Sequence, residues 1–175
     1  MQLDLNIPIL EPAGSERLSE AALAAIEYTL AGSITIRDRS DIRSVKHWSE
    51  RLEPFEHQVR NLITFCRRAP VALIADDVGM GKTISAGLII SELMVRKKVK
   101  RVLILAPKIL LPQWCDELES KFGIDAVFAT GAQLSRFARS RTSVVVTTYA
   151  SALNRMEELT NSGFDMLVLD EAHKV

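Results

Sequence analysis

Apolar residues in the second part of the chain gather in short, nearly continuous runs separated by polar stretches. The clearest runs fall at residues 71–75, 101–107, 143–148 and 165–170, and a weaker one falls at 126–129. Runs of this length, rich in valine, isoleucine and leucine, are typical of strands that are buried on both faces of a parallel sheet. The pattern therefore predicts five strands in this part of the chain.

Segments with apolar residues at helical spacing lie before and between these runs. Pro54 suits the first turn of a helix, and apolar positions follow it at intervals of three and four residues. The long apolar segment 84–95 predicts a helix that its neighbours largely cover, and 108–122 and 150–159 predict two more helices. Strands that alternate with helices predict an α/β fold with a mostly parallel, doubly wound sheet.

The N-terminal part of the chain has a different character. An alanine-rich stretch at 16–31 predicts a helix that ends at Gly32, and the alternating residues 33–36 predict a short strand. No residue in this part points to a particular chemistry. We therefore expect a small accessory segment of mixed structure at 1–50 and a core domain at 51–175.

Composition and charge narrow the classes of protein to consider. The 175 residues include 22 basic and 22 acidic side chains, so bulk charge predicts neither nucleic-acid nor membrane binding, and a DNA contact has to come from a local patch. No apolar run is long enough to span a bilayer, and the N-terminus lacks the pattern of a signal peptide, so we expect a cytoplasmic protein without a membrane partner. Cys66 and Cys115 have no zinc-site spacing and are expected to be reduced and partly buried.

A glycine-containing loop, Asp76-Asp-Val-Gly-Met-Gly-Lys-Thr83, follows the first predicted strand of the core. Gly79 and Gly81 allow an anion to approach the backbone, and the unpaired N–H groups of the following helix attract negative charge. Lys82 is suited to reach β- and γ-phosphates, and the Thr83 hydroxyl is suited to bind Mg²⁺. The general pattern G-x-x-x-x-G-K-[ST] has glycine where this chain has Asp76, so an ordinary tight turn with a surface lysine is the alternative interpretation.

A second motif, Asp170-Glu-Ala-His173, follows the last predicted strand. An aspartate at the tip of a strand binds Mg²⁺ directly or through water, and the adjacent Glu171 polarises a water for attack on a γ-phosphate. Two adjacent carboxylates are also compatible with a simple turn. Their place downstream of a Gly-Lys-Thr loop favours a nucleotide site, since ligands of such sheets lie at the carboxyl ends of the strands.

The two motifs together resemble helicase superfamily two. Within it, Val102-Leu-Ile-Leu-Ala-Pro-Lys-Ile-Leu-Leu-Pro-Gln-Trp114 and Val144-Val-Val-Thr-Thr-Tyr149 are similar to conserved blocks of the SWI/SNF-type ATPases, nearest to their bacterial RapA-like branch. The resemblance covers about residues 50–175. It implies a RecA-like P-loop NTPase lobe, the first of two ATP-binding lobes.

The resemblance also implies a role for each matching position. Gln58 would contact adenine, and the phosphates would be held by Gly79, Met80, Gly81, Lys82 and Thr83. Mg²⁺ would be bound by Thr83 and Asp170, and catalysis would depend on Lys82, Asp170 and Glu171. The phosphate backbone of one DNA strand would be touched by Pro107, Lys108, Thr147 and Thr148. His173 would couple the nucleotide site to later motifs.

Family resemblance thus implies an ATP- and Mg²⁺-dependent translocase on double-stranded DNA, with RNA polymerase or other DNA-associated proteins as further partners. The sequence stops two residues after His173, so we expect only the first lobe, a sheet incomplete at its C-terminus, and a missing second RecA-like lobe. Because that lobe supplies arginine fingers worth roughly 10³–10⁵ in rate, the isolated chain is expected to bind nucleotide weakly and to show negligible ATPase activity. The alternatives are a strand-separating DEAH helicase, a restriction-type translocase subunit, or a truncated, non-catalytic nucleotide-binding remnant.

Overall fold

The computed structural model describes residues 34–69, 71–76, 79–140 and 142–172. The residues from Thr35 onward form one compact unit. The predicted helix at 16–31 lies outside the described residues, and so does His173. None of the helices formed by the described residues is long and apolar enough to cross a membrane.

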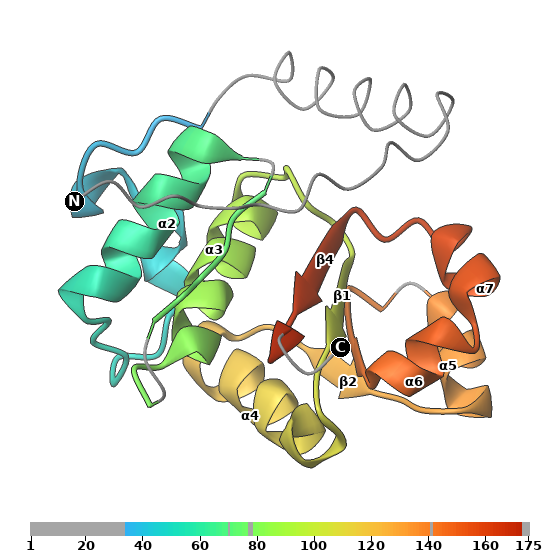
Figure 1. Cartoon of the computed structure of the whole chain (residues 1–175). Coiled ribbons are helices and arrows are strands. Elements are labelled where there is room, and N and C mark those ends of the chain that lie inside the picture. The colour runs from blue at the N-terminus through green and yellow to red at the C-terminus, as the bar shows by residue number, and fades with distance from the viewer. Residues whose placement is uncertain (1–33, 70, 77–78, 141, 173–175) are drawn as a thin grey trace, which may run out of the picture. The chain divides into compact units, whose positions relative to one another are not determined.

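Four parallel strands form one sheet in the order β2-β3-β1-β4 (Figure 1). They are β1 (Val102–Leu105), β2 (Ala126–Phe128), β3 (Val144–Thr147) and β4 (Met166–Leu169). Every residue of the two central strands, β1 and β3, is buried, as their continuous apolar runs predict. The predicted α/β class and the parallel sheet of a RecA-like lobe are therefore confirmed.

The register of the sheet brings three strand ends to one edge. Leu105 of β1 lies opposite Thr147 of β3 on one side and opposite Leu169 of β4 on the other. The backbone N–H of Asp170 continues this ladder by donating to the Leu105 carbonyl oxygen at 2.8 Å. The residues that follow these strands therefore emerge at a common carboxyl edge of the sheet.

Helices cover both faces of the sheet (Figure 1). One face carries α3 (Lys82–Val95) and α4 (Leu111–Phe122). The other carries the short helices α5 (Ala132–Ala138), α6 (Tyr149–Leu153) and α7 (Met156–Thr160). Buried residues of the sheet and of the short helices form one apolar cluster between them: Leu103, Leu105, Ala129, Leu134, Ala138, Val145, Ala152 and Leu159.

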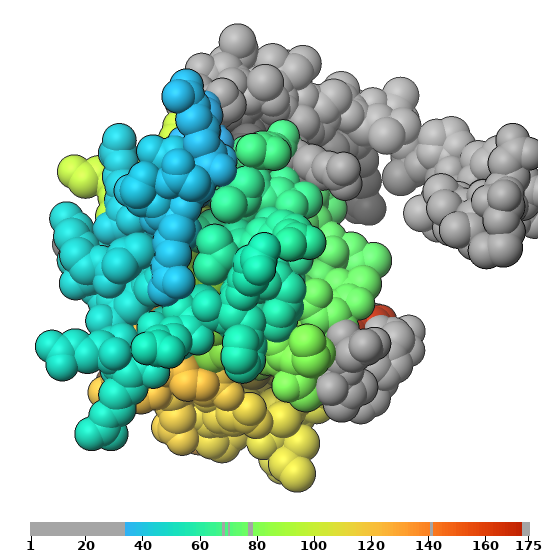
Figure 2. All heavy atoms as spheres, turned by 90° about the vertical axis from the view of Figure 1, so that its left-hand side faces the viewer, coloured from blue at the N-terminus to red at the C-terminus, as the bar shows by residue number. Residues whose placement is uncertain are grey.

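Two further segments pack on α3. Helix α2 (Glu56–Arg68) runs along it, and two 3-10 helices, η1 (Arg39–Asp41) and η2 (Arg43–His47), lie close by, with η2 in contact with α3. Figure 2 shows this face of the molecule, with the blue and cyan residues of η1 and η2 beside the teal residues of α2. Helix α3 is therefore enclosed, and all of its residues from 84 to 93 are buried.

A buried carboxylate fastens η2 to α3. Glu92 is fully buried and accepts hydrogen bonds from the backbone N–H groups of Arg43 at 3.0 Å and Ser44 at 2.8 Å. Nε of Arg96 lies 2.6 Å from the same carboxylate, and its Nη2 donates to the carbonyl oxygen of Asp41. Burial raises the pKa of Glu92, but the hydrogen bonds from Arg43, Arg96 and Ser44 outweigh it and hold the pKa below its ordinary value.

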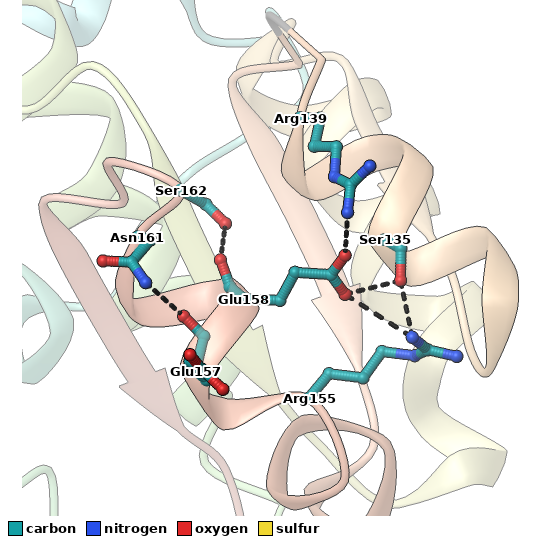
Figure 3. Close-up of polar contacts among 7 residues, drawn as sticks. All are labelled: Ser135, Arg139, Arg155, Glu157, Glu158, Asn161 and Ser162. Atoms are coloured by element: carbon teal, nitrogen blue, oxygen red, sulfur yellow. Dashed lines mark hydrogen bonds and ion pairs between the residues drawn. The ribbon is translucent and has the colours of Figure 1, made fainter.

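A polar cluster joins α5 to α7 on the other face (Figure 3). Glu158 accepts hydrogen bonds from Ser135 Oγ at 2.6 Å and Arg139 Nη2 at 2.7 Å, and these contacts lower its pKa. Arg155 Nη1 donates to the same Ser135 hydroxyl at 2.7 Å. An open hollow of about 1000 Å³ lies beside this cluster, and Arg101, directly before β1, lines it. The hollow therefore lies toward the amino ends of the strands, away from the edge that carries Asp170.

The predicted strand at 71–75 is wrong. Residues 71–76 have no regular secondary structure, and the side chains of Val71 and Leu73 are 79% and 85% exposed. A strand is stable only when a neighbour satisfies its backbone groups, and none of the four strands among the described residues pairs with this segment. Among the described residues the sheet ends at β4, where Leu167 and Leu169 are about half exposed.

Smaller differences concern the helices and the cysteines. The single helix predicted at 150–159 is two short helices, α6 and α7, and α5 was not predicted. Residues 34–36 do not form the predicted strand. Cys66 and Cys115 are both free thiols, as predicted, and burial raises the pKa of each to about 11.

Candidate functional site

The loop before α3 has the backbone of a tight anion-binding turn. Gly79 and Gly81 have φ angles of +84° and +74°, in the left-handed region that favours glycine. Gly81 is the N-cap of α3, so Lys82 and Thr83 occupy the first turn of a 14-residue helix. The N-terminus of such a helix presents unpaired N–H groups and the positive end of its dipole. An anion is therefore favoured at this position.

The side chain of Gln58 connects the loop to the start of α2 by hydrogen bonds. Its side-chain nitrogen donates to the carbonyl oxygens of Met80 at 3.2 Å and Gly81 at 3.4 Å, and its side-chain oxygen accepts from the Phe55 N–H at 2.9 Å. Gln58 is only 3% exposed, and its amide is occupied by protein groups at both ends. A Cβ at Gly81 would lie 2.5 Å from this amide nitrogen, so a larger residue at position 81 would have to displace the Gln58 amide.

Two aromatic rings lie at the surface beside the same turn. His57 Nε2 lies 3.0 Å from the Met80 carbonyl oxygen, a contact that the sequence did not predict. The ring of Phe55 stacks on that of His57 with centroids 5.7 Å apart, and Phe55 is 66% exposed. A flat, apolar surface therefore adjoins the loop.

Asp76, which replaces the first glycine of the general pattern, connects three segments. Its Oδ2 accepts a hydrogen bond from Asn61 Nδ2 of α2 at 2.7 Å, and the same amide lies 3.2 Å from Ser85 Oγ of α3. The Asp76 carbonyl oxygen accepts from Lys82 Nζ at 3.0 Å. Sequence analysis missed Asn61, although it follows Gln58 by three residues and so shares its face of α2.

Asp170 is held at the carboxyl edge of the sheet by side chains from two helices, α4 and α6. The indole N–H of Trp114 donates to Asp170 Oδ2 at 2.8 Å, and the Tyr149 hydroxyl donates to the Asp170 carbonyl oxygen at 2.8 Å. Burial and the negative charges of Asp170 and Glu171 raise the pKa of Tyr149, so its hydroxyl keeps its proton. Glu171 itself has a φ of +55°, an unusual backbone conformation for a residue with a side chain.

The four residues predicted to touch DNA are not equivalent. Lys108 is exposed, Pro107 and Thr148 are half-buried, and all three follow the carboxyl ends of β1 or β3. Thr147 is fully buried, and its hydroxyl donates to the Ala129 carbonyl oxygen at 2.7 Å. The structure therefore brings three of these residues to the edge of the sheet and leaves Thr147 in the interior.

The Thr83 hydroxyl and the Asp170 carboxylate suit a magnesium–nucleotide complex better than a bare metal ion. No group of three or more histidine, cysteine, aspartate or glutamate side chains among the described residues is arranged to hold a metal by itself. Mg²⁺ in phosphate sites usually takes one or two protein oxygens, and waters and phosphate oxygens complete its shell. The Thr83 hydroxyl and the Asp170 carboxylate are such oxygens, and no atom within 4 Å would meet a Cβ at Gly79.

The chain is similar to several known proteins. The SNF2-related domain family matches residues 47–175. The chain is 31% identical over 170 residues to the RNA polymerase-associated protein RapA of Pseudomonas aeruginosa (strain LESB58), covering 91% of this chain and 18% of that protein. It is 39% identical over 106 residues to the uncharacterized ATP-dependent helicase YqhH of Bacillus subtilis (strain 168), covering 59% of this chain and 18% of that protein. The chain thus spans about a fifth of the length of these relatives.

Proposed function

This chain belongs to the SNF2-related family, and on that premise we propose that residues 51–175 are the first ATP-binding lobe of an ATP-dependent translocase that acts on double-stranded DNA. One relative is named an ATP-dependent helicase, and the all-parallel sheet is that of a RecA-like lobe. Residues 1–50 are proposed as an accessory segment to this lobe.

The observation that carries the proposal is the left-handed Gly81 at the N-terminus of α3, with Lys82 and Thr83 directly after it. A closed turn at the start of a long helix provides the backbone donors that phosphates require. Lys82 adds a positive charge beside the loop, where its Nζ donates to the Asp76 carbonyl oxygen at 3.0 Å. A phosphate bound at this turn would form an ion pair and a charge-assisted hydrogen bond with that ammonium group.

The remaining roles follow from the positions of the side chains. Thr83 and Asp170 bind Mg²⁺, which neutralises the phosphate charge, and Glu171 orients the attacking water. Met80 supplies backbone to the phosphate loop. Gln58 holds the phosphate loop through its hydrogen bond to the Met80 carbonyl oxygen. The adenine ring binds on the side of the loop where Gln58 and the exposed Phe55 lie. His173 couples this site to the second lobe.

Calorimetric titration of ATP with and without Mg²⁺ tests the nucleotide-binding proposal. Thr83→Val keeps the shape of the side chain and removes its hydroxyl, so the affinity gained from Mg²⁺ should fall roughly tenfold, equivalent to about 1.4 kcal/mol. Thr64→Val makes the same change at an exposed position of α2 and should bind as the wild type does. A wild-type chain that gains no ATP affinity from Mg²⁺, or a Thr83→Val variant that gains as much as wild type, contradicts the proposal.

We place the DNA contact at the carboxyl edge that carries Pro107, Lys108 and Thr148. The net charge of the chain is zero, so binding depends on a few local groups, of which Lys108 is the exposed cation. In a fluorescence anisotropy titration with a short DNA duplex, Lys108→Ala should bind more weakly and reduce the salt slope by about one. Lys100→Ala, an exposed lysine before β1, should change neither quantity, and equal binding by both variants contradicts this placement.

The 175-residue chain by itself is proposed to bind ATP weakly and to hydrolyse it negligibly, since it spans about a fifth of its relatives. RNA polymerase or another DNA-associated protein is proposed as a partner of the whole protein, because one relative is named as associated with RNA polymerase. Robust ATP turnover by the purified chain, abolished by Lys82→Ala, contradicts the first of these proposals.

A further inference from the structure

Trp114 reaches from α4 to the aspartate at the tip of β4. Its Nε1–H donates to Asp170 Oδ2 at 2.8 Å across 56 positions of sequence. Trp114 is 3% exposed and lies on the buried face of α4, together with Leu111, Leu118 and Phe122. The donor of this hydrogen bond is therefore buried, while Asp170 at its other end is half-buried.

The chemistry of the two groups makes this contact directional. The indole N–H only donates, and an ionised carboxylate only accepts. A hydrogen bond to a carboxylate favours its charged form and is roughly twice as strong as one between neutral groups. The indole occupies Oδ2 and restricts the rotation of the Asp170 carboxylate, and no hydrogen bond among the described residues engages its other oxygen, Oδ1.

Two other contacts hold residue 170, but both act on its backbone. The Tyr149 hydroxyl donates to the Asp170 carbonyl oxygen, and the Asp170 N–H donates to the Leu105 carbonyl oxygen, each at 2.8 Å. The backbone position therefore does not depend on Trp114. Of the three contacts, that of Trp114 alone reaches the carboxylate.

We propose that Trp114 is a positioning residue that orients the Asp170 carboxylate for the Mg²⁺ of a bound magnesium–nucleotide complex. The proposal rests on the nucleotide-binding function proposed above. Removal of a group that orients a metal ligand costs about 10–100-fold in metal affinity. The Mg²⁺ requirement for nucleotide binding should therefore depend on the indole N–H, while the contacts of the phosphate loop should not.

Trp114→Phe tests this, because it keeps an aromatic ring in the core and removes the N–H. The matched control is Trp48→Phe, which removes the indole N–H that donates to Ser44 Oγ at 3.1 Å, on η2. The probe is the fluorescent N-methylanthraniloyl derivative of ADP, titrated in EDTA and at increasing MgCl₂. In EDTA, the affinity of Trp114→Phe for the probe should match that of wild type within about twofold. With MgCl₂, the variant should need about tenfold more Mg²⁺ than wild type for the same gain in affinity. Trp48→Phe should match wild type in both conditions.

Equal Mg²⁺ requirements in Trp114→Phe and wild type overturn the inference. A wild-type chain that binds the probe identically with and without Mg²⁺ overturns the proposed function instead, so the two failures are distinguishable. Where circular dichroism shows that Trp114→Phe does not fold, the Trp48→Phe variant gives the answer, since Trp114 is then its one tryptophan and can be excited selectively. Its emission should change on addition of MgCl₂ with ADP and should not change once Asp170→Asn is added. No change in Trp48→Phe while the probe binds with Mg²⁺ overturns the inference.

Discussion

Nδ2 of Asn61 lies 2.7 Å from Oδ2 of Asp76, so α2 is fastened to the loop at the position where the general phosphate-loop pattern has glycine. The same amide lies 3.2 Å from Ser85 Oγ of α3. The two helices and the loop between them thus meet at one polar contact.

Asn61→Ala should lower the stability of the chain. It leaves the Asp76 carboxylate without its closest donor, and a hydrogen bond to a charged group is worth about 1.5–3 kcal/mol. Urea unfolding followed by circular dichroism measures the free energy of unfolding. Gln133→Ala, at an exposed position of α5, is the control and should stay within about 0.5 kcal/mol of wild type. Equal stability of Asn61→Ala and wild type shows that the contact does not hold the loop.

Gly81→Ala should lower the stability of the chain by more than the left-handed backbone conformation at this position explains. Alanine at a φ of +74° costs about 1–2 kcal/mol, and its Cβ would also lie 2.5 Å from Gln58 Nε2. Gly163→Ala is matched to it, with a φ of +72° and no atom within 4 Å of the added Cβ. Thermal unfolding should show a loss larger by about 1–3 kcal/mol at Gly81 than at Gly163. Equal losses would mean that Gln58 moves aside without cost.

Glu92→Gln should destabilise the chain by about 1.5–3 kcal/mol, because the charged partner of the Arg43 and Ser44 N–H groups and of Arg96 is lost. Glu56→Gln is the control, since Glu56 also pairs with an arginine four residues away but both side chains are exposed. An exposed pair of this kind is worth about 0.2–1 kcal/mol. Urea unfolding of both variants at pH 7 gives the comparison, and equal losses contradict a special role for Glu92.

The stabilisation by Glu92 should depend on pH in a defined direction. Burial opposes ionisation, but the hydrogen bonds from Arg43, Arg96 and Ser44 lower the pKa in the folded state below the ordinary value of 4.5. A lowered pKa means that the stabilisation is complete above the unfolded-state value and is lost as the pH falls through the folded-state value. The stability difference between wild type and Glu92→Gln should therefore be constant near neutral pH and shrink below pH 4.5. A difference that grows on acidification contradicts this sign.

Gly87→Ala should destabilise the contact between α3 and α4. A Cβ at residue 87 would lie 2.3–3.0 Å from three atoms of the Phe122 ring, which is itself 2% exposed. Overpacking of this kind costs about 1–3 kcal/mol, more than the roughly 1 kcal/mol that alanine gains over glycine in a helix. Phe122→Leu shortens the facing side chain. It should therefore lower the free energy of unfolding less in the Gly87→Ala background than in the wild-type chain. Additive losses in this double-mutant cycle contradict a direct clash.

The elements that the sequence predicted well are those whose signal is local. Strands β1 and β3 are buried along their whole length, and each appears as an unbroken apolar run at its observed position. The long apolar segment of α3 and the glycine pattern before it are equally local. The run at 71–75 shows the limit of this reasoning, since apolar character favours a strand but only a neighbouring strand completes it.

The contacts that sequence reasoning missed join residues far apart in the chain. Glu92 is charged yet fully buried, because its donors lie almost fifty positions earlier in η2. Trp114 and Asp170 are separated by 56 positions. One signal was available for Trp114: a buried tryptophan usually finds a partner for its N–H, and the carboxyl ends of parallel strands are the place where such a partner lies.

The affinity of the chain for ATP in the presence of Mg²⁺, measured for wild type and Lys82→Ala, decides most directly whether the loop before α3 is a nucleotide site. Lys82 belongs to the first turn of α3, and its Nζ donates a hydrogen bond to the Asp76 carbonyl oxygen of the loop at 3.0 Å. Replacing it should weaken ATP binding by about tenfold or more, since a charge-assisted hydrogen bond to phosphate is lost. Lys100→Ala should bind as wild type does. Absence of ATP binding by the wild-type chain, or equal binding by Lys82→Ala, would contradict the account.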